Sequence, residues 1–321
     1  MPRLAMCIPA YNAAWCLPRL LKSAAEQSWP FDEILVYDDC STDGTAEIAA
    51  RLGATVVRGD TNRGPSVGKT RLAAATDADW IHFHDADDDL KPGFVEAARE
   101  WMPQDVDVVV FGCEERWEEG GGLISMNVPD DAELVADTVG YSIHSKINAI
   151  SGLYRRQAFL DAGGFDLDPD VLYNEDQALH CKLALAGLRF RGDPRVLVVN
   201  YRQEQSFWTS DKSRPVRAHY HLMRKMADRV TSHAHRRYVA ERLWLVAGGS
   251  AAQLDWATAD EASRLALRLA GAAPVQGGAL FGAVARISPA LALRLREYAV
   301  RALKPRFRDG YPGWRSPVNI L

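Results

Sequence analysis

The chain has 321 residues and a formal net charge of −4, with 47% hydrophobic and 25% charged residues. A chain of this length can fold as one large domain or two smaller ones, and its slight acidity argues against a protein built as a whole to bind nucleic acid. The five cysteines are scattered, odd in number and without a C-x-x-C pair, which argues against a disulfide framework or a cysteine-based zinc site.

The N-terminus runs directly into a predicted strand and lacks the pattern of a signal peptide. No apolar stretch reaches the roughly 18 residues that a membrane span needs. We therefore expect a cytoplasmic protein, which could still lie against the inner face of a membrane.

Predicted strands and helices alternate through the first hundred residues. Short runs of β-forming residues predict strands, and apolar residues at helical spacing predict helices between them. Alternation of this kind indicates βαβ units and a mainly parallel, Rossmann-like α/β sheet. The expected strands are 4–8, 34–37, 54–57 and 80–84, and the expected helices are about 15–24, 45–52, 67–75 and 94–101.

The pattern changes in the second half of the chain. Further strands are expected at 106–111, at 150–155 and within 188–201, with a polar excursion or hairpin at 114–137. From about residue 206 the chain is rich in Ala, Leu and Arg at helical spacing. This spacing predicts an all-helical C-terminal extension.

Four acidic residues follow the strand predicted at 80–84, namely Asp85, Asp87, Asp88 and Asp89. Two carboxylates about 4 Å apart repel each other by roughly 4 kcal/mol at an effective dielectric constant near 20. A divalent cation removes that repulsion, and Mg²⁺ and Mn²⁺ prefer carboxylate oxygen. Ligands of open α/β sheets also bind at the carboxyl ends of strands. The alternative is an acidic turn that caps the following helix.

Several motifs occur in an order that resembles the family 2 glycosyltransferases of the GT-A fold. The resemblance covers residues 4–202 and implies an α/β fold with a mixed, mainly parallel sheet flanked by helices. The motifs are Ile8-Pro9-Ala10-Tyr11-Asn12, Val36 to Thr45, Asn62 to Arg71, Asp85-Ala86-Asp87-Asp88, Gly163-Gly164-Phe165-Asp166 and Glu175-Asp176.

The resemblance implies a nucleotide site at the ends of the first strands. By analogy with the family, Tyr11 would stack on the base, and Pro9 and Ala10 would lie in the same loop. Asp39 would accept a hydrogen bond from the imide of uracil. Lys69, where the family more often has Arg, would face the nucleotide or its phosphates.

The same resemblance implies a metal site and a base. Asp85 would approach the ribose or the metal, Ala86 would separate the two acids, and Asp87 would bind Mn²⁺ or Mg²⁺ directly. Asp176 would be the general base, with Glu175 beside it in contact with donor or acceptor. The alternative for Glu175-Asp176 is a capped first helical turn, where acids favour the helix dipole.

Chemistry supports two separate acidic sites. A sugar donor leaves as a highly charged diphosphate, and a divalent metal stabilises that charge. Displacement at the anomeric carbon also needs a base for the proton of the acceptor hydroxyl. A carboxylate bound to a cation is a poor base, so the base should be a different acid downstream.

The expected function is an inverting, metal-dependent glycosyl transfer from a nucleotide sugar, expected to be a UDP-sugar, to a glycan or lipid-linked saccharide. Processive synthases of this family carry a Gln-x-x-Arg-Trp motif, which residues 203–208 do not match. A non-processive enzyme is therefore expected. The alternatives are a nucleotidyltransferase and a non-catalytic relative that binds nucleotide or glycan. Against the first of these, the segment after the first strand is not a Gly-rich loop with Arg and Lys.

The resulting domain prediction has a catalytic domain at 1–205 and a helical extension at 206–321. Within the catalytic domain, the nucleotide-sugar half is expected at about 1–112 and the acceptor half at about 113–205.

The C-terminal helices combine basic and apolar residues, which could place them on an anionic membrane. The alternative is that their apolar faces pack inside the protein and leave the arginines in water. The residues concerned are Leu280, Phe281, Val284, Arg286, Ile287, Leu291, Leu293, Arg294, Leu295, Arg296, Arg301, Lys304, Arg306 and Arg308.

Overall fold

The computed structural model describes residues 1–145, 147–203, 213–271, 278–308 and 311. The chain divides into two compact units. The first, here called the sheet unit, comprises 1–167 and 175–206; the second, called the helical unit, comprises 168–174 and 207–321. The predicted domain boundary near residue 205, and most of the 203–208 segment, lie outside the described residues.

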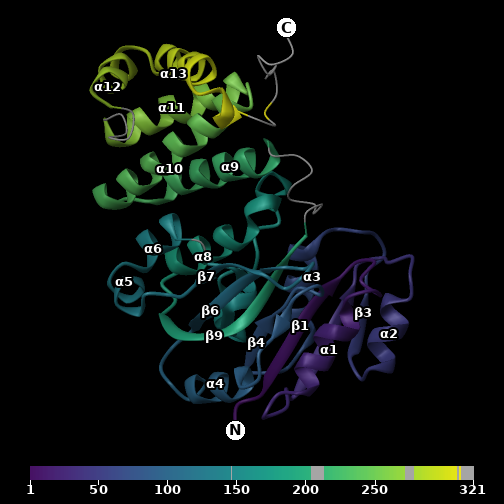
Figure 1. Cartoon of the computed structure of the whole chain (residues 1–321). Helices are drawn as coiled ribbons and strands as arrows, with labels where there is room; N and C mark the ends of the chain where they lie inside the picture. Colours follow the sequence, from purple (N-terminus) through teal and green to yellow (C-terminus); the bar gives the residue numbers. More distant parts are fainter. Residues whose placement is uncertain (146, 204–212, 272–277, 309–310, 312–321) are drawn as a thin grey trace, which may run out of the picture. The chain divides into compact units, whose positions relative to one another are not determined.

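The sheet unit is built on one mixed sheet, whose strand order is β3-β2-β1-β4-β8-β6-β9-β5 with β7 beside β6 (Figure 1). The first four strands pair in parallel, and β6 pairs in parallel with β9, whereas β8, β5 and β7 run antiparallel to their neighbours. The predicted fold class is confirmed. The strands are β1 (Leu4–Ala10), β2 (Glu33–Asp38), β3 (Thr55–Arg58), β4 (Trp80–Phe83), β5 (Asp89–Leu90), β6 (Val108–Trp117), β7 (Leu123–Asn127), β8 (Gly152–Arg155) and β9 (Phe190–Arg202).

Helices cover both faces of this sheet. Successive side chains of β1 point to opposite faces, and each face is packed in a core of its own. Met6 and Ile8 face a core shared with α1 and α4, whereas Ala5 and Cys7 face a second core shared with α3, α7 and α8. The helices of the unit are α1 (Leu17–Ala25), α2 (Thr45–Arg51), α3 (Pro65–Ala75), α4 (Phe94–Trp101), α5 (Asp131–Ala136), α6 (Thr138–His144), α7 (Arg156–Asp161) and α8 (Glu175–Leu185), with a 3₁₀ turn η1 (Ala149–Ser151).

The polar region after β6 contains more structure than the sequence predicted. The expected hairpin is β6–β7, and its turn passes through Gly120 and Gly121, which have positive φ angles of 77° and 65°. The helices α5 and α6 were not predicted. Both are short, and each begins at an aspartate, Asp130 or Asp137, whose side chain accepts a main-chain N–H of the first turn.

The helical unit confirms the predicted helical extension. It contains α9 (Ser213–Arg229), α10 (His233–Ala252), α11 (Trp256–Ala270), α12 (Gly278–Ile287), α13 (Pro289–Leu303) and the 3₁₀ turn η4 (Pro305–Arg308). A further 3₁₀ segment, η2 (Pro169–Asn174), belongs to this unit although it precedes α8 in the chain. Within the described ranges, no helix has both the length and the apolarity to cross a membrane.

Candidate active site

The predicted site residues gather at the carboxyl ends of β1, β2 and β4, which are neighbours in the sheet. The loop from Tyr11 onward follows β1, Asp39 follows β2, and Asp85 to Asp88 follow β4. The first two loops are tied together, because the N–H of Asn12 donates to Ser41 Oγ at 2.9 Å. Convergence of strand ends is the physical reason that such distant motifs form one site.

The prediction that Pro9 and Ala10 lie in the loop is wrong. Both residues belong to β1 and stand in register with Tyr37 and Asp38 of β2. Pro9 is tolerated there because the pairing of β1 with β4 ends at Cys7, so the strand has a neighbour on one side only. The loop begins at Tyr11, whose side chain is half exposed.

Asp39 is buried and anchors a third loop. Its carboxylate accepts the N–H of Gly64 at 2.7 Å and that of Arg63 at 2.9 and 3.0 Å. These partners stand at the start of α3, which carries Lys69. Asp39 therefore fixes the entry to α3 relative to the end of β2, a role the sequence did not predict.

Lys69 joins the two acidic motifs. Its side chain is buried, and Nζ lies 2.8 Å from Asp85 Oδ1. Burial alone would lower the pKa of Lys69, but the charges of Asp85 and Asp176 outweigh it and raise that pKa. The charges of Asp85, which follows β4, and of Asp176, which opens α8, thus act on one buried ammonium group.

Glu175 and Asp176 form the first turn of α8. Burial, and next the charge of Asp176, raise the pKa of Glu175 from 4.5 to about 8. Glu175 therefore holds a proton at neutral pH. His180, one turn later, places Nδ1 2.7 Å from the main-chain carbonyl oxygen of Asp176, so its ring is bonded to the helix and not to the acid side chain.

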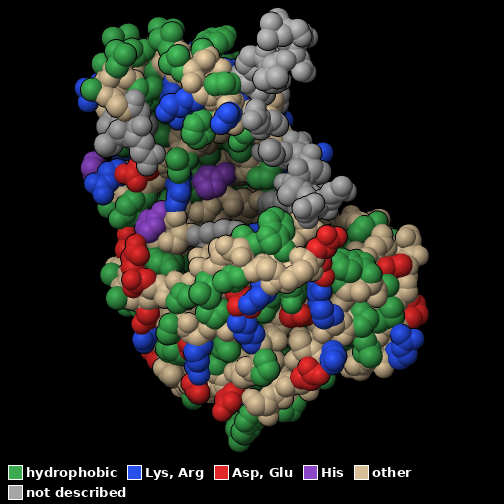
Figure 2. Space-filling model, viewed as in Figure 1, with side chains coloured by type: hydrophobic (Ala, Val, Ile, Leu, Met, Phe, Trp, Pro, Cys, Tyr) green, Lys and Arg blue, Asp and Glu red, His purple; other side chains and the backbone are tan. Residues whose placement is uncertain are grey.

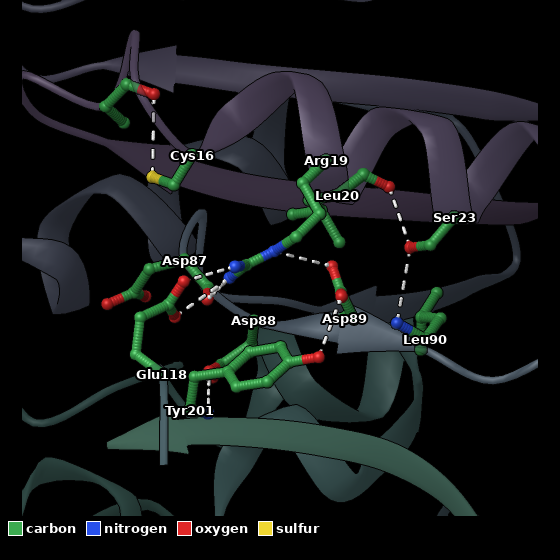
Figure 3. A network of polar contacts seen from close by, with 11 residues as sticks. Cys16, Arg19, Leu20, Ser23, Asp87, Asp88, Asp89, Leu90, Glu118 and Tyr201 are labelled. Atoms are coloured by element: carbon green, nitrogen blue, oxygen red, sulfur yellow. Dashed lines mark hydrogen bonds and ion pairs between the residues drawn. The ribbon is translucent and has the colours of Figure 1, made fainter. Parts of the chain in front are cut away.

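An arginine of α1 holds the loop that contains Asp87 (Figure 3). Arg19 donates to the main-chain carbonyl of Asp87, to Glu118 Oε1 at 2.5 Å and to Asp89 Oδ1 at 3.2 Å. The guanidinium also lies 4.3 Å from the centroid of the Tyr201 ring. Four segments therefore meet at one side chain, and nothing in the local sequence around Arg19 marked it as a site residue.

Asp88 anchors the same loop from its other side. Its carboxylate accepts Asn200 Nδ2 and the N–H of Tyr201, each at 2.7 Å. Burial, followed by the charges of Asp87 and Asp85, raises the pKa of Asp88 well above 3.8. Asp88 is thus a structural link to β9, which leaves Asp85 and Asp87 as the acids available to a ligand.

The chemistry of Asp85 and Asp87 fits a divalent cation. Burial, and next the charge of Asp85, raise the pKa of Asp87 from 3.8 to about 6, and a bound cation would favour the ionised form of this acid. Among the described residues, no group of three or more His, Cys, Asp or Glu is arranged to hold a metal. Two carboxylates suffice where Mg²⁺ takes its remaining ligands from substrate phosphates and water.

The two histidines of the 80–84 strand region are hydrogen-bonded within the fold. His82 Nδ1 lies 2.9 Å from the carbonyl oxygen of Gly152, and His82 Nε2 lies 3.0 Å from His84 Nδ1. Both rings are fully buried, and burial lowers the pKa of His82 to about 4. They are neutral and bonded within the fold.

Residues 6–156 match the sequence model of the family described as "Glycosyl transferase family 2". The chain carries a family 2 glycosyltransferase domain. This domain is similar to a putative teichuronic acid biosynthesis glycosyltransferase, TuaG, of Bacillus subtilis, at 30% identity over 106 residues, or 32% of this chain and 42% of that protein. The chain spans less than two thirds of the length of the curated relatives it matches.

Solved structures confirm the GT-A fold of this family 2 domain. Staphylococcus aureus TarS 1–349 in complex with UDP-GlcNAc superposes with a TM-score of 0.70 at 19% identity, covering 96% of this chain and 92% of that one. The mannosyltransferase PcManGT of Pyrobaculum calidifontis, in complex with GDP-Man and Mn²⁺, gives a TM-score of 0.59 at 19% identity, over 96% and 83% of the two chains.

Proposed function

We propose that this chain is an inverting, metal-dependent, non-processive glycosyltransferase that moves one sugar from a UDP-sugar to a hydroxyl of a glycan or lipid-linked saccharide. The observation that carries the proposal is the buried ammonium of Lys69, which brings Asp85 and the Glu175-Asp176 pair into one electrostatic cluster. A metal-side acid and a separate base are the two acidic functions that this reaction needs.

The nucleotide would bind across the ends of β1 and β2. The half-exposed ring of Tyr11 is available to stack on a base. Asp39 is buried nearby, because its N–H donates to the carbonyl of Ala10 at 2.8 Å, and its carboxylate is oriented by two main-chain amides. Pro9 and Ala10 would form the floor beneath the base, as the last residues of β1. Solved complexes of TarS 1–349 with UDP and UDP-GlcNAc support a UDP-sugar donor.

Asp87 would hold the Mn²⁺ or Mg²⁺ ion, with Asp85 beside it and Ala86 as the small spacer between them. When bound, the cation would neutralise the diphosphate and so make it a better leaving group. Lys69 would keep one oxygen of Asp85 in place through their ion pair. The structural neighbour PcManGT was solved in complex with GDP-Man and Mn²⁺, which supports a divalent metal in the proposed reaction.

Asp176 would remove the proton from the acceptor hydroxyl as that oxygen attacks the anomeric carbon. Glu175, whose pKa is raised by burial and next by the charge of Asp176, would lie beside the base in contact with donor or acceptor. Direct attack from the face opposite the leaving diphosphate inverts the anomeric carbon. We further propose that residues 1–112 bind the donor and 113–205 the acceptor.

Donor hydrolysis in the absence of acceptor tests the proposal against its alternatives. The protein is incubated with UDP-, GDP- and dTDP-sugars, with and without Mn²⁺, and the products are separated by ion-exchange chromatography. Slow, Mn²⁺-dependent release of UDP supports the proposed transferase. Release of pyrophosphate from a sugar phosphate and nucleoside triphosphate would identify a nucleotidyltransferase, and donor binding without any product would identify a non-catalytic relative.

A further inference from the structure

Helix α13 is apolar on two opposite faces, and only one of them is covered. Ala292 and Leu293 are buried, as is the acid Glu297. The other face carries an exposed stripe at helical spacing, since residues three or four positions apart lie on one side of a helix. The exposed fractions are 50% for Leu291, 53% for Leu295 and 66% for Tyr298, and Leu303, the last residue of the helix, is 80% exposed.

Neighbouring segments of the helical unit extend this apolar surface. Leu280 and Ile287 of α12 are 80% and 89% exposed, and Phe307 of η4 is 68% exposed. Hydrophobic side chains gather over α12 and α13 on the face of the molecule shown in Figure 2. An exposed apolar surface on this scale is typical of a site that binds another surface.

The charge on these segments has one sign. Glu297 is the sole acid in the sequence from 278 to 308, and its buried carboxylate is bound by Arg301 at 2.8 Å and by Arg308 at 2.7 Å. Arg294 is likewise bound to Asp260 of α11.

Four other cations of these segments are exposed and form no ion pair with the residues that the structure describes. They are Arg286, Arg296, Lys304 and Arg306, of which Arg296 lies off the apolar stripe, with its guanidinium next to Gly248 of α10. The surface therefore presents apolar side chains together with cations that no described acid neutralises.

We propose that this surface, called the basic apolar surface, binds an anionic phospholipid bilayer. It consists of Leu280, Arg286, Ile287, Leu291, Leu295, Tyr298, Leu303, Lys304, Arg306 and Phe307. Apolar residues would enter the boundary between headgroups and acyl chains, and the cations would pair with lipid phosphates.

A bilayer would bind both the exposed apolar side chains and the exposed cations. A polyanion in water would bind the cations alone and leave the apolar stripe exposed. Contact with a bilayer would bring the enzyme to a lipid-linked acceptor. That consequence rests on the proposed function, but the binding itself does not.

Flotation with vesicles tests the inference without donor, metal or turnover. The full chain is mixed with vesicles of phosphatidylcholine alone or with added phosphatidylglycerol. We expect it to float with the anionic vesicles, to float little with the neutral ones, and to be released by salt. Failure to float with either, or equal flotation with both, would overturn the proposal.

Two double variants separate the contribution of the cations from that of the apolar side chains. Arg286→Glu with Lys304→Glu should weaken binding to anionic vesicles by about thirtyfold or more, and Leu295→Asn with Tyr298→Asn by about tenfold. Leu245→Asn on α10 is the matched control, because Leu245 is 51% exposed and lies outside the surface. Thermal unfolding and UDP binding should be the same in all variants.

Two further outcomes are informative. A wild-type chain that elutes as a dimer in gel filtration, becomes monomeric with Leu295→Asn and does not float would show that the surface binds a second copy, which overturns the lipid proposal. A chain that floats as expected yet never hydrolyses a nucleotide sugar would support lipid binding and refute the proposed function.

Discussion

Lys69 Nζ lies 2.8 Å from Asp85 Oδ1, and the lysine side chain is only 2% exposed. This ion pair joins α3 to the end of β4 and gives the acidic loop a fixed positive neighbour. The two acids therefore differ. Asp85 already has a cationic partner in Lys69, whereas the pKa of Asp87 is raised to about 6 by burial and by the charge of Asp85. A bound cation would favour the ionised form of Asp87.

Replacing Lys69 with Met should destabilise the sheet unit by about 2–3 kcal/mol, because removing one partner of a buried ion pair leaves a charge uncompensated. This value lies below the usual range of about 3–5 kcal/mol, since the Asp85 side chain is about a third exposed and its charge is partly screened by water. Lys69→Arg should cost much less. Urea unfolding measures these changes, with Lys22→Met as the control, because Lys22 forms an exposed pair with Glu26. A Lys69→Met variant as stable as the control would contradict the assigned role.

Asp87→Ala should abolish transfer and remove the extra thermal stabilisation that Mn²⁺ adds to UDP binding, because the proposed direct ligand is lost. Asp85→Ala should affect metal binding less, because Asp85 is the acid already bound to Lys69. Thermal shift with UDP, with and without Mn²⁺, measures this, and exposed Asp77→Ala is the control. Full activity in excess chelator would contradict the metal-dependent mechanism.

Arg19→Lys should weaken Mn²⁺ binding in the presence of UDP by about tenfold or more, the range typical of residues that orient metal ligands. Lysine keeps the charge but cannot donate in a fork to the Asp87 carbonyl, Glu118 and Asp89 at once. Titration calorimetry measures the metal affinity, and exposed Arg51→Lys is the control. Unchanged affinity would mean that other contacts, such as those of Asp88, hold the loop.

Asp176→Asn should lower kcat by about 10²–10⁴-fold while donor and metal affinity stay nearly unchanged, because the variant keeps the size but cannot accept the proton. The pair of measurements is donor affinity by calorimetry and single-turnover rate on the same variant. If Glu175-Asp176 only caps α8, the change should instead cost at most about 1 kcal/mol of stability and leave turnover intact. Loss of donor binding together with activity would show that another residue is the base.

Glu175→Gln should stabilise the protein increasingly as the pH rises. The folded protein holds the Glu175 proton up to a pKa of about 8, whereas the group ionises near 4.5 when unfolded. Between these values the folded state binds more protons, so the free energy of unfolding falls as the pH rises. The glutamine variant cannot ionise and lacks this slope. Its Tm advantage over wild type should therefore grow between about pH 5 and pH 8; exposed Glu119→Gln should show no such trend. Parallel Tm profiles for Glu175→Gln and wild type would contradict a buried, protonated Glu175.

The sequence by itself determined the fold class and the positions of the acidic motifs. Strands that alternate with helices predict a parallel sheet, and both kinds of element can be recognised from the local periodicity of the chain. The carboxyl ends of parallel strands lie at one edge of a sheet, so motifs that follow predicted strands, as with Tyr11, Asp39 and Asp85, could be assigned to that edge.

Tertiary structure decided what these residues touch. The contacts of Arg19 with Glu118 and of Asp88 with Asn200 join segments about a hundred residues apart, and local patterns carry no information about such pairings. The place of Pro9 within β1 depended on where β4 ends, not on its own neighbours in the chain. On α13 the sequence showed apolar residues on two sides, but periodicity cannot tell which side is covered. Only packing of the neighbouring helices buried Leu293 and left Leu295 in water.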